Sequence, residues 1–211
     1  MKTMNNDELA TTLESHLGNG ISAEAKSILQ DAIARIKNIG KYTSSLFTRG
    51  ATLTVQPKGA FHIVEKNVND SWKNIIAREK EKLNPYPWFD EDIWKCFNGV
   101  TIPAITNEFT STIQRFTQTL THKQILEEAE KMSIKKVYTW LEAKQIIENA
   151  IFAGEIETRG IGIIAYFKVE GNENFYRFRA WRDDDGRLRV GVHEVGLVEE
   201  WIAGRGACFS N

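Results

Sequence analysis

Apolar residues at helical spacing predict two helices at the start of the chain. Leucines recur at every fourth position within residues 5–17, and the asparagine that begins this segment can cap the helix. Residues 22–39 repeat the pattern with isoleucine and alanine, and Gly40 ends it. We expect the two helices to pair as a helical hairpin.

The periodicity changes from helical to alternating within residues 51–66, which predicts a β-hairpin. Leu53 and Val55 alternate with polar residues, and the same alternation continues after a short loop. This three-residue loop ends in Gly59 and sets Val55 opposite Phe61, so that the apolar residues share one face.

Helical spacing returns after the hairpin and predicts helices over residues 70–83 and 90–97. The segment NPYP between them carries two prolines and marks a break. We therefore expect residues 1–100 to form a helical region that contains one β-hairpin, and residues 101–211 to form a second region.

Three helices are predicted at the start of the second region. Apolar residues at positions 109, 113, 116 and 120 follow one helix face, which predicts a helix over residues 104–120. Two capping boxes begin the next helices, over residues 122–132 and 139–153: Thr121 with Gln124, and Thr139 with Glu142.

Alternation with a period of two predicts four strands after Gly154. Residues 155–171 are expected to form two strands around a turn at positions 159–160. Residues 176–193 are expected to form two more around the turn Asp-Asp-Gly at 184–186, followed by a short helix around 197–202. The predicted fold class is α+β, with a helical N-terminal part, further helices, and a four-stranded antiparallel sheet.

Five of the eleven arginines lie in the last predicted hairpin, and its register decides which way they point. The three-residue loop sets Ala180 opposite Val190 and Phe178 opposite Val192, so these residues face the core. Arg182 shares the apolar face beside the turn, where we expect it to reach water. The opposite face carries arginines and two ring side chains: Arg177, Arg179, Trp181, Arg187, Arg189 and His193.

Guanidinium groups stack on indole rings and bind phosphate or carboxylate groups through paired hydrogen bonds. The predicted face therefore suits single-stranded nucleic acid, a nucleotide or an acidic partner protein. In that case Trp181 is exposed, whereas Trp140 and Trp201 belong to the core. The alternative is a solvated structural face whose arginines pair with carboxylates such as Asp183 and Glu194.

Residues 104–169 carry three predicted helices, then the segment AGEIETRG at 153–160 and the strand-like IGIIAYFKV. This order of elements resembles a winged-helix domain. The resemblance implies that the third helix enters the major groove of DNA. The same helix carries two glutamates, which are unfavourable beside phosphates. Its candidate contacts with the groove are three polar residues: Lys144, Gln145 and Asn149.

The composition is that of an ordinary globular protein, with 42% hydrophobic residues, 26% charged residues and a net charge of −1 over 211 residues. The balanced charge excludes a polyanion binder that acts through bulk charge alone. No apolar run reaches about 18 residues, so we expect no membrane partner. Cys96 and Cys208 stand apart outside any motif, which favours reduced thiols in a cytoplasmic protein.

The sequence holds no phosphate-binding loop, dinucleotide fingerprint or nucleophile elbow, and its four histidines lack metal-ligand spacing. We therefore expect a non-enzymatic regulatory or inhibitory protein, without metal or other cofactor, that binds nucleic acid or a nucleoprotein complex. Accessory proteins of phages and mobile elements are of this kind.

Two alternatives to this function stay open. One is a protein-interaction module whose arginine face is structural, with an acidic protein partner or a homodimer as its assembly. The other is a divergent hydrolase or nuclease, for which His193 and Glu157 are candidates, since catalytic residues assemble in space.

Overall fold

The computed structural model describes residues 6–15, 22–30, 33, 46–82, 86–132, 134 and 137–210. The chain divides into two compact units, Met1–Ser45 and Leu46–Asn211. In the first unit, α1 spans Asn6–Ser15 and residues 23–30 are helical, as the apolar spacing predicts. The cap at residue 5, the turn between the helices and the end at residue 40 lie outside the described residues.

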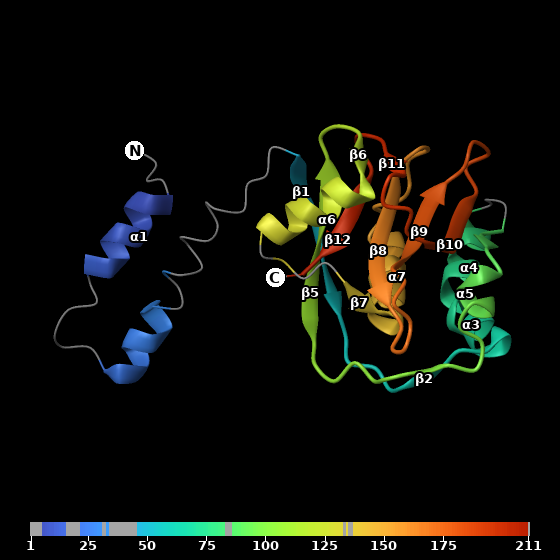
Figure 1. Cartoon of the computed structure of the whole chain (residues 1–211), viewed down its shortest axis with the longest axis horizontal. Helices are drawn as coiled ribbons and strands as arrows, with labels where there is room; N and C mark the ends of the chain where they lie inside the picture. The colour runs from blue at the N-terminus through green and yellow to red at the C-terminus, as the bar shows by residue number, and fades with distance from the viewer. Residues whose placement is uncertain are drawn as a thin grey trace. The chain divides into compact units, whose positions relative to one another are not determined.

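The second unit contains a mixed eight-stranded sheet (Figure 1). Its strands are β1 (Phe47–Val55), β3 (Trp88–Phe89), β5 (Phe109–Phe116), β7 (Tyr138–Thr139), β8 (Gly162–Lys168), β9 (Tyr176–Arg182), β10 (Leu188–Glu194) and β12 (Gly206–Phe209). They follow the order β1-β5-β12-β8-β9-β10-β3, and β7 also pairs with β8. β12 runs parallel to β8 and antiparallel to β5, and β3 runs parallel to β10.

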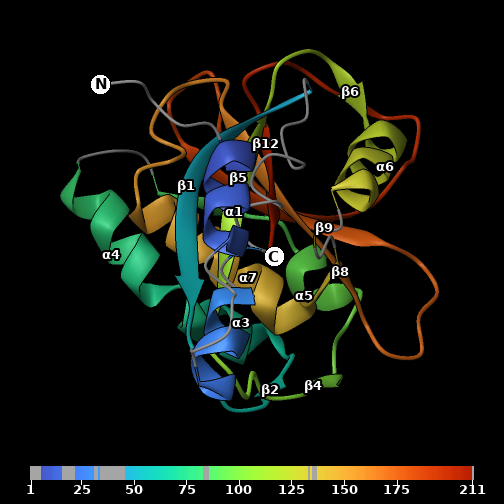
Figure 2. The same cartoon turned by 90° about the vertical axis from the view of Figure 1, so that its left-hand side faces the viewer.

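Four short strands form two separate pairs. β2 (Phe61–His62) pairs with β4 (Thr101–Ile102), and β6 (Leu120–Thr121) pairs with β11 (Glu200–Trp201). The described helices of this unit are α3 (Glu65–Ser71), α4 (Lys73–Glu81), α5 (Asp92–Lys95), α6 (His122–Lys131) and α7 (Trp140–Phe152). Figure 1 shows α6 on the viewer's side of the sheet and α7 behind β8, and Figure 2 gives the view turned by 90°.

Both predicted capping boxes are confirmed. Thr121 Oγ1 accepts a hydrogen bond from the backbone N–H of Gln124, and Thr139 Oγ1 accepts one from the N–H of Glu142. The side chains of Gln124 and Glu142 accept the reciprocal bonds from the cap residues. These side chains satisfy amide groups that the first turn of each helix leaves unpaired.

The main apolar core lies between the sheet and α7. Phe178 on β9 packs edge-on against Trp140 on α7, with the ring centroids 5.2 Å apart, and Phe61 stacks on the same indole at 5.3 Å. Val190 and Val192 on β10 are buried in the same cluster. The opposite face of β9 and β10 is therefore the one that carries polar side chains, whereas that of β8 carries the buried Ile164 and Tyr166.

The helix predicted over residues 104–120 is wrong, because residues 109–116 form strand β5. This strand pairs with β1 on one side and with β12 on the other. Phe109, Ser111 and Ile113 share one strand face, and the segment is rich in β-branched threonine, which favours strands. The winged-helix resemblance is also wrong, because it requires three helices. The first of them, predicted over residues 104–120, is absent, and only α6 and α7 remain.

The β-hairpin predicted at residues 51–66 is also wrong. β1 pairs with β5, which sets Val55 opposite Phe109, and β2 pairs with β4, which sets Phe61 opposite Ile102. Each of the two strands therefore pairs with a segment that is distant in the sequence, and they do not pair with each other across the loop at residues 57–59. The β1–β5 pairing also crosses residue 100, where a boundary between two regions was predicted. The helical N-terminal part with one hairpin is therefore replaced by a sheet-based unit.

The register predicted for the last hairpin is confirmed. Ala180 lies opposite Val190 and Phe178 opposite Val192, and Gly186 in the turn has a φ of 75° that favours glycine. Two neighbouring predictions are wrong. Residues 155–160 form turns instead of a strand, and residues 200–201 form β11 instead of a helix. The predicted four-stranded antiparallel sheet is replaced by the larger mixed sheet.

Candidate functional site

The face of the sheet opposite α7 arranges its side chains in cross-strand rows. Trp181 on β9 lies opposite Arg189 on β10, and Arg189 lies beside Trp88 on β3. In the next row, Arg179 lies opposite Gly191. We call this surface, with the side chains that fold over it, the arginine–tryptophan face: Trp88, Arg179, Trp181, Arg187, Arg189, His193, Trp201 and Arg205.

Arg177 lies at the base of this face and is a structural residue. Its side chain is 3% exposed, and Nη2 donates to both carboxylate oxygens of Glu199 at 2.7 Å. Nη1 donates to Nε2 of His122 at 2.6 Å, and Nδ1 of His122 lies 2.6 Å from the hydroxyl of Tyr166. Because these contacts use its guanidinium group, Arg177 is not available to a ligand as the sequence suggested.

The buried network shifts the ionisation of its members. Burial, reinforced by the charge of Arg177, lowers the pKa of His122 to about 4, so the imidazole is neutral. Burial alone would raise the pKa of Glu199, but the hydrogen bonds from Arg177 outweigh it and hold that pKa below its ordinary value. The network therefore contains one cation and one anion.

Arg179 lies between two indole rings. Its guanidinium carbon is 3.9 Å from the ring centroid of Trp181 and 5.5 Å from that of Trp201, and Arg205 approaches Trp201 at 5.2 Å. Its side chain forms no ion pair or hydrogen bond with any residue that the structure describes. Burial, together with the like charges of Arg205 and Arg177, lowers the pKa of Arg179 to about 10.

A partly buried guanidinium group that lies near like charges is stabilised when an anion approaches it. Arg205 adds to this tendency, because burial lowers its pKa and its Nε donates only to the carbonyl of Gly160 at 3.4 Å. Within the described residues, neither Arg179 nor Arg205 forms an ion pair with a carboxylate, although the charges of Glu199 and Asp90 partly oppose the lowering of the Arg179 pKa. The pair is therefore the part of the face best suited to bind a phosphate or carboxylate group.

Arg189 forms an ion pair with a carboxylate, and it also lies between Trp181 and Trp88 in one cross-strand row, which we call the aromatic row. Its Nε donates to Asp183 Oδ2 at 2.8 Å, and its guanidinium carbon lies 5.0 Å from the ring centroid of Trp88. Asp183 also accepts hydrogen bonds from the backbone of Asp185 and Arg187, so the turn fixes it. Arg187 is partly buried, and its side chain pairs with no carboxylate in the described part of the chain.

His193 and Asp90 meet above Gly191. Nε2 of His193 lies 3.4 Å from Asp90 Oδ2, and Asp90 Oδ1 accepts a hydrogen bond from Trp88 Nε1 at 2.8 Å. A Cβ atom at Gly191 would overlap Asp90 Oδ2 and lie 2.9 Å from His193 Nε2, so only glycine leaves room for this pair. Burial, and next the charge of Arg177, lower the pKa of His193, which keeps the imidazole neutral near pH 7.

The three residues proposed to contact a DNA groove lie against the protein instead. Lys144 is 1% exposed and its Nζ lies 2.5 Å from Glu148 Oε1, while burial lowers its pKa to about 8. Asn149 Nδ2 donates to the carbonyl oxygen of Thr54 at 2.7 Å, and Gln145 faces the backbone just after β1. The contacts of Asn149 and Gln145 join α7 to the end of β1, and that of Lys144 lies within α7, so the polar groups of all three residues have partners inside the protein.

The second nuclease candidate, Glu157, has a structural environment. Its carboxylate forms ion pairs with Arg78 at 2.8 Å, with Lys82 at 2.5 Å and with Arg182 at 3.2 Å. Because these ion pairs use its carboxylate, Glu157 does not form a catalytic pair with His193. No cluster of three or more His, Cys, Asp or Glu side chains among the described residues is arranged to hold a metal ion.

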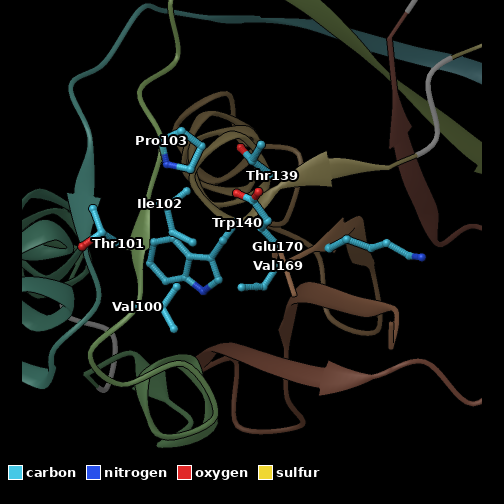
Figure 3. Close-up of a pocket in the computed structure, with 9 residues that line it drawn as sticks. Val100, Thr101, Ile102, Pro103, Thr139, Trp140, Val169 and Glu170 are labelled. Carbon is cyan, nitrogen blue, oxygen red and sulfur yellow. The ribbon is translucent and has the colours of Figure 1, made fainter. Parts of the chain in front are cut away.

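A cavity of about 150 Å³ lies at the N-terminal end of α7 (Figure 3). Ile102, Pro103, Trp140 and Val169 form its apolar walls. Trp140 is fully buried, as predicted, and none of the lining residues belongs to the arginine–tryptophan face. The cavity is thus a separate feature of the core boundary.

Reasoning from the sequence missed four members of the candidate site: Trp88, Asp90, Trp201 as a ring between arginines, and Arg205. Their places depend on β3 joining β10 and on residues 195–205 folding over the sheet. The local signals were weak. Trp88 and Asp90 follow the proline-rich break, and Arg205 stands between two glycines.

No protein-family model, curated protein or solved structure matches the chain. None of the described helices has the length and apolar character needed to cross a membrane. The function is therefore inferred from the geometry of the face.

Proposed function

We propose that the protein binds single-stranded nucleic acid through the arginine–tryptophan face, either free or within a nucleoprotein complex. In this proposal it acts in the cytoplasm as a regulatory or inhibitory accessory protein. The observation that carries the proposal is the guanidinium group of Arg179, which lies between Trp181 and Trp201 without a carboxylate partner among the described residues.

Phosphate groups fit the electrostatics of this position. Arg179 and Arg205 are both partly buried cations, and a bound phosphate offers each of them charge-assisted hydrogen bonds that the described part of the protein does not supply. Because the chain as a whole is almost neutral, the attraction is local to this face.

Unpaired bases fit the aromatic row beside the phosphate position. Trp88 is 51% exposed at the edge of the sheet, and Trp181 lies two strands away across Arg189. Exposed indole and guanidinium surfaces stack on the faces of bases, which a double helix hides. The combination therefore favours single strands over duplexes.

Fluorescence anisotropy with short labelled DNA and RNA strands tests the proposal. Arg179→Gln should weaken binding by about tenfold or more, the effect of losing a charged hydrogen-bond donor. It should also reduce the slope of log affinity against log salt concentration by about 0.7, the value for one phosphate contact on a single strand.

Arg49→Gln is the matched control, because it removes the same charge from an exposed position on β1 at the other edge of the sheet. Its affinity should stay close to that of the unchanged protein. Equal binding by the Arg179 and Arg49 variants, with both folded by circular dichroism, would refute a role for the face.

A protein-interaction module is the second candidate function. Three arginines of the hairpin have internal carboxylate partners, since Arg177 pairs with Glu199, Arg182 with Glu79 and Arg189 with Asp183. Apolar side chains near β11 are also exposed: Leu197, Val198 and Ile202. Under this function, Val198→Ser would weaken a complex with a partner protein. Neither the unchanged protein nor the Arg179→Gln variant would then bind nucleic acid detectably.

A further inference from the structure

His193, Asp90 and Arg179 converge on the space above Gly191. Arg179 is the direct cross-strand neighbour of Gly191, and His193 lies two residues further along β10 on the same face. Directly opposed side chains in a sheet lie about 5 Å apart at Cβ and diagonal ones about 7–8 Å apart. One phosphodiester group can therefore contact the guanidinium group and the imidazole together.

We infer that this face cleaves the RNA strand it binds, with His193 as the general base for a ribose 2′-hydroxyl and Arg179 as the phosphate ligand. The inference rests on the proposed binding of nucleic acid. It adds an activity to that binding and limits the substrate to strands that carry a 2′-hydroxyl group.

The Asp90 carboxylate defines which nitrogen of His193 acts as the base. Nε2 is buried 3.4 Å from Asp90 Oδ2 without forming a hydrogen bond, and the negative charge of this carboxylate favours the tautomer with a proton on Nε2. Nδ1 is then the basic nitrogen left for a substrate. Asp90 is itself fixed by Trp88 Nε1 and by a hydrogen bond from its backbone N–H to the carbonyl of Val190. Asp90 is thus a positioning residue.

The charges around His193 leave the imidazole free to accept a proton near neutral pH. Arg177 and Arg179 face it from β9, and Asp90 and Asp92 face it from the segment that follows β3. Burial and the two arginines lower its pKa, and the two aspartates oppose them. A base of this kind is deprotonated at pH 7 and still takes part in proton transfer.

The reaction is a transesterification that needs no outside reactant besides water. Nδ1 of His193 takes the proton of the 2′-hydroxyl, and the 2′-oxygen forms a bond to phosphorus. The bond from phosphorus to the 5′-oxygen breaks, and that oxygen takes a proton from water. His193 then returns its proton to the hydroxide, which leaves a 2′,3′-cyclic phosphate and a 5′-hydroxyl end. Arg179 stabilises the additional negative charge on the phosphate oxygens.

The test uses a labelled single-stranded RNA in buffer with EDTA, and the same sequence as DNA. The full-length protein should bind both strands but cleave only RNA, giving ends with a cyclic phosphate. His193→Ala should lower the cleavage rate at least about 100-fold with little change in affinity, as expected for loss of a general base. Arg49→Gln should cleave at the rate of the unchanged protein, and His193→Ala, purified in the same way, shows how much cleavage a contaminating ribonuclease contributes.

Two further variants separate catalysis from structure. Asp90→Asn should lower the rate and move the pH profile, which for the unchanged protein rises with a midpoint below the ordinary histidine pKa of 6.5. Gly191→Ala should lower the rate by displacing Asp90, with both catalytic side chains still present. If the His193→Ala variant does not fold, Gly191→Ala still tests whether the arrangement of His193 and Asp90 is needed for cleavage.

The outcomes distinguish the two proposals. Binding of RNA without cleavage, or equal cleavage by the unchanged protein and His193→Ala, would overturn the inference and leave the proposed binding intact. Absence of binding to either strand would overturn both.

Discussion

Glu79 on α4 and Arg182 at the end of β9 form a buried ion pair with two hydrogen bonds. Nη1 of Arg182 lies 2.9 Å from Oε2 of Glu79 and Nη2 lies 3.1 Å from Oε1, and the two side chains are 4% and 0% exposed. Nη1 also donates to the carbonyl of Gly186 at 2.9 Å. The pair ties the helical layer to the turn between β9 and β10, so Arg182 does not reach water as the sequence suggested.

Removing one member of this pair should be more costly than removing both. Arg182→Met leaves a carboxylate buried without a partner, which should lower the free energy of unfolding by about 3–5 kcal/mol. Arg182→Met combined with Glu79→Leu should recover most of this loss, because neither charge then remains. Urea unfolding of the two single variants and the double variant gives the coupling, and strictly additive losses would show that the pair is not coupled.

The buried imidazole of His122 should make stability depend on pH. Its pKa is about 4 in the folded protein and near 6.5 when unfolded, so the unfolded chain binds the extra proton first. The contribution is complete above pH 6.5 and is lost as the pH falls toward 4, by about 3 kcal/mol in total. Urea unfolding between pH 7 and pH 4 measures this loss.

The carboxylates of the protein also titrate in part of this range, so a control is needed. His122→Asn keeps a polar side chain beside Tyr166 and removes the titrating group. The variant should be less stable at pH 7 and should lose less stability on acidification. An unchanged pH dependence would mean that other groups produce it.

Trp201 and Trp181 should differ in their effect on stability. Trp201 is 1% exposed, as predicted, and Trp201→Ala should cost about 3–5 kcal/mol. Trp181 was predicted to be exposed, but it is partly buried beneath the guanidinium group of Arg179. Trp181→Ala should therefore cost an intermediate amount, about 1–2 kcal/mol. Thermal and urea unfolding check the order, and equal costs would contradict it.

The parts of the fold that could be predicted depend on neighbouring residues. The register of β9 and β10 follows from the turn at 184–186, and the starts of α6 and α7 follow from side chains three residues apart. β5 could not be predicted in this way, because Phe109 and Ile113 are four residues apart and fit a helix face and a strand face alike. Its partners β1 and β12 are distant in the sequence, and they decide the outcome.

In the candidate site too, the features set by neighbouring residues could be predicted and those set by distant segments could not. Alternation along β9 and β10 places Arg179, Trp181 and Arg189 on one face, and the structure has them there. Alternation does not show that Arg177 is buried against Glu199, or that Trp88 joins the row. Those contacts depend on the edge pairing of β3 and on the path of the chain after β10, which no local pattern specifies.

The position of β12 has a consequence for how the protein is made. This strand follows every other described strand in the sequence, yet it lies between β5 and β8 and joins the two parts of the sheet. During translation, β5 has no partner for this edge until residues 206–209 have left the ribosome, and β8 has one only where β7 pairs with Phe167 and Lys168. A ribosome that stalls before that point releases a chain in which the strand edges next to β12 stay unpaired, which invites aggregation and proteolysis. The cell therefore obtains this protein folded only when synthesis has passed β12.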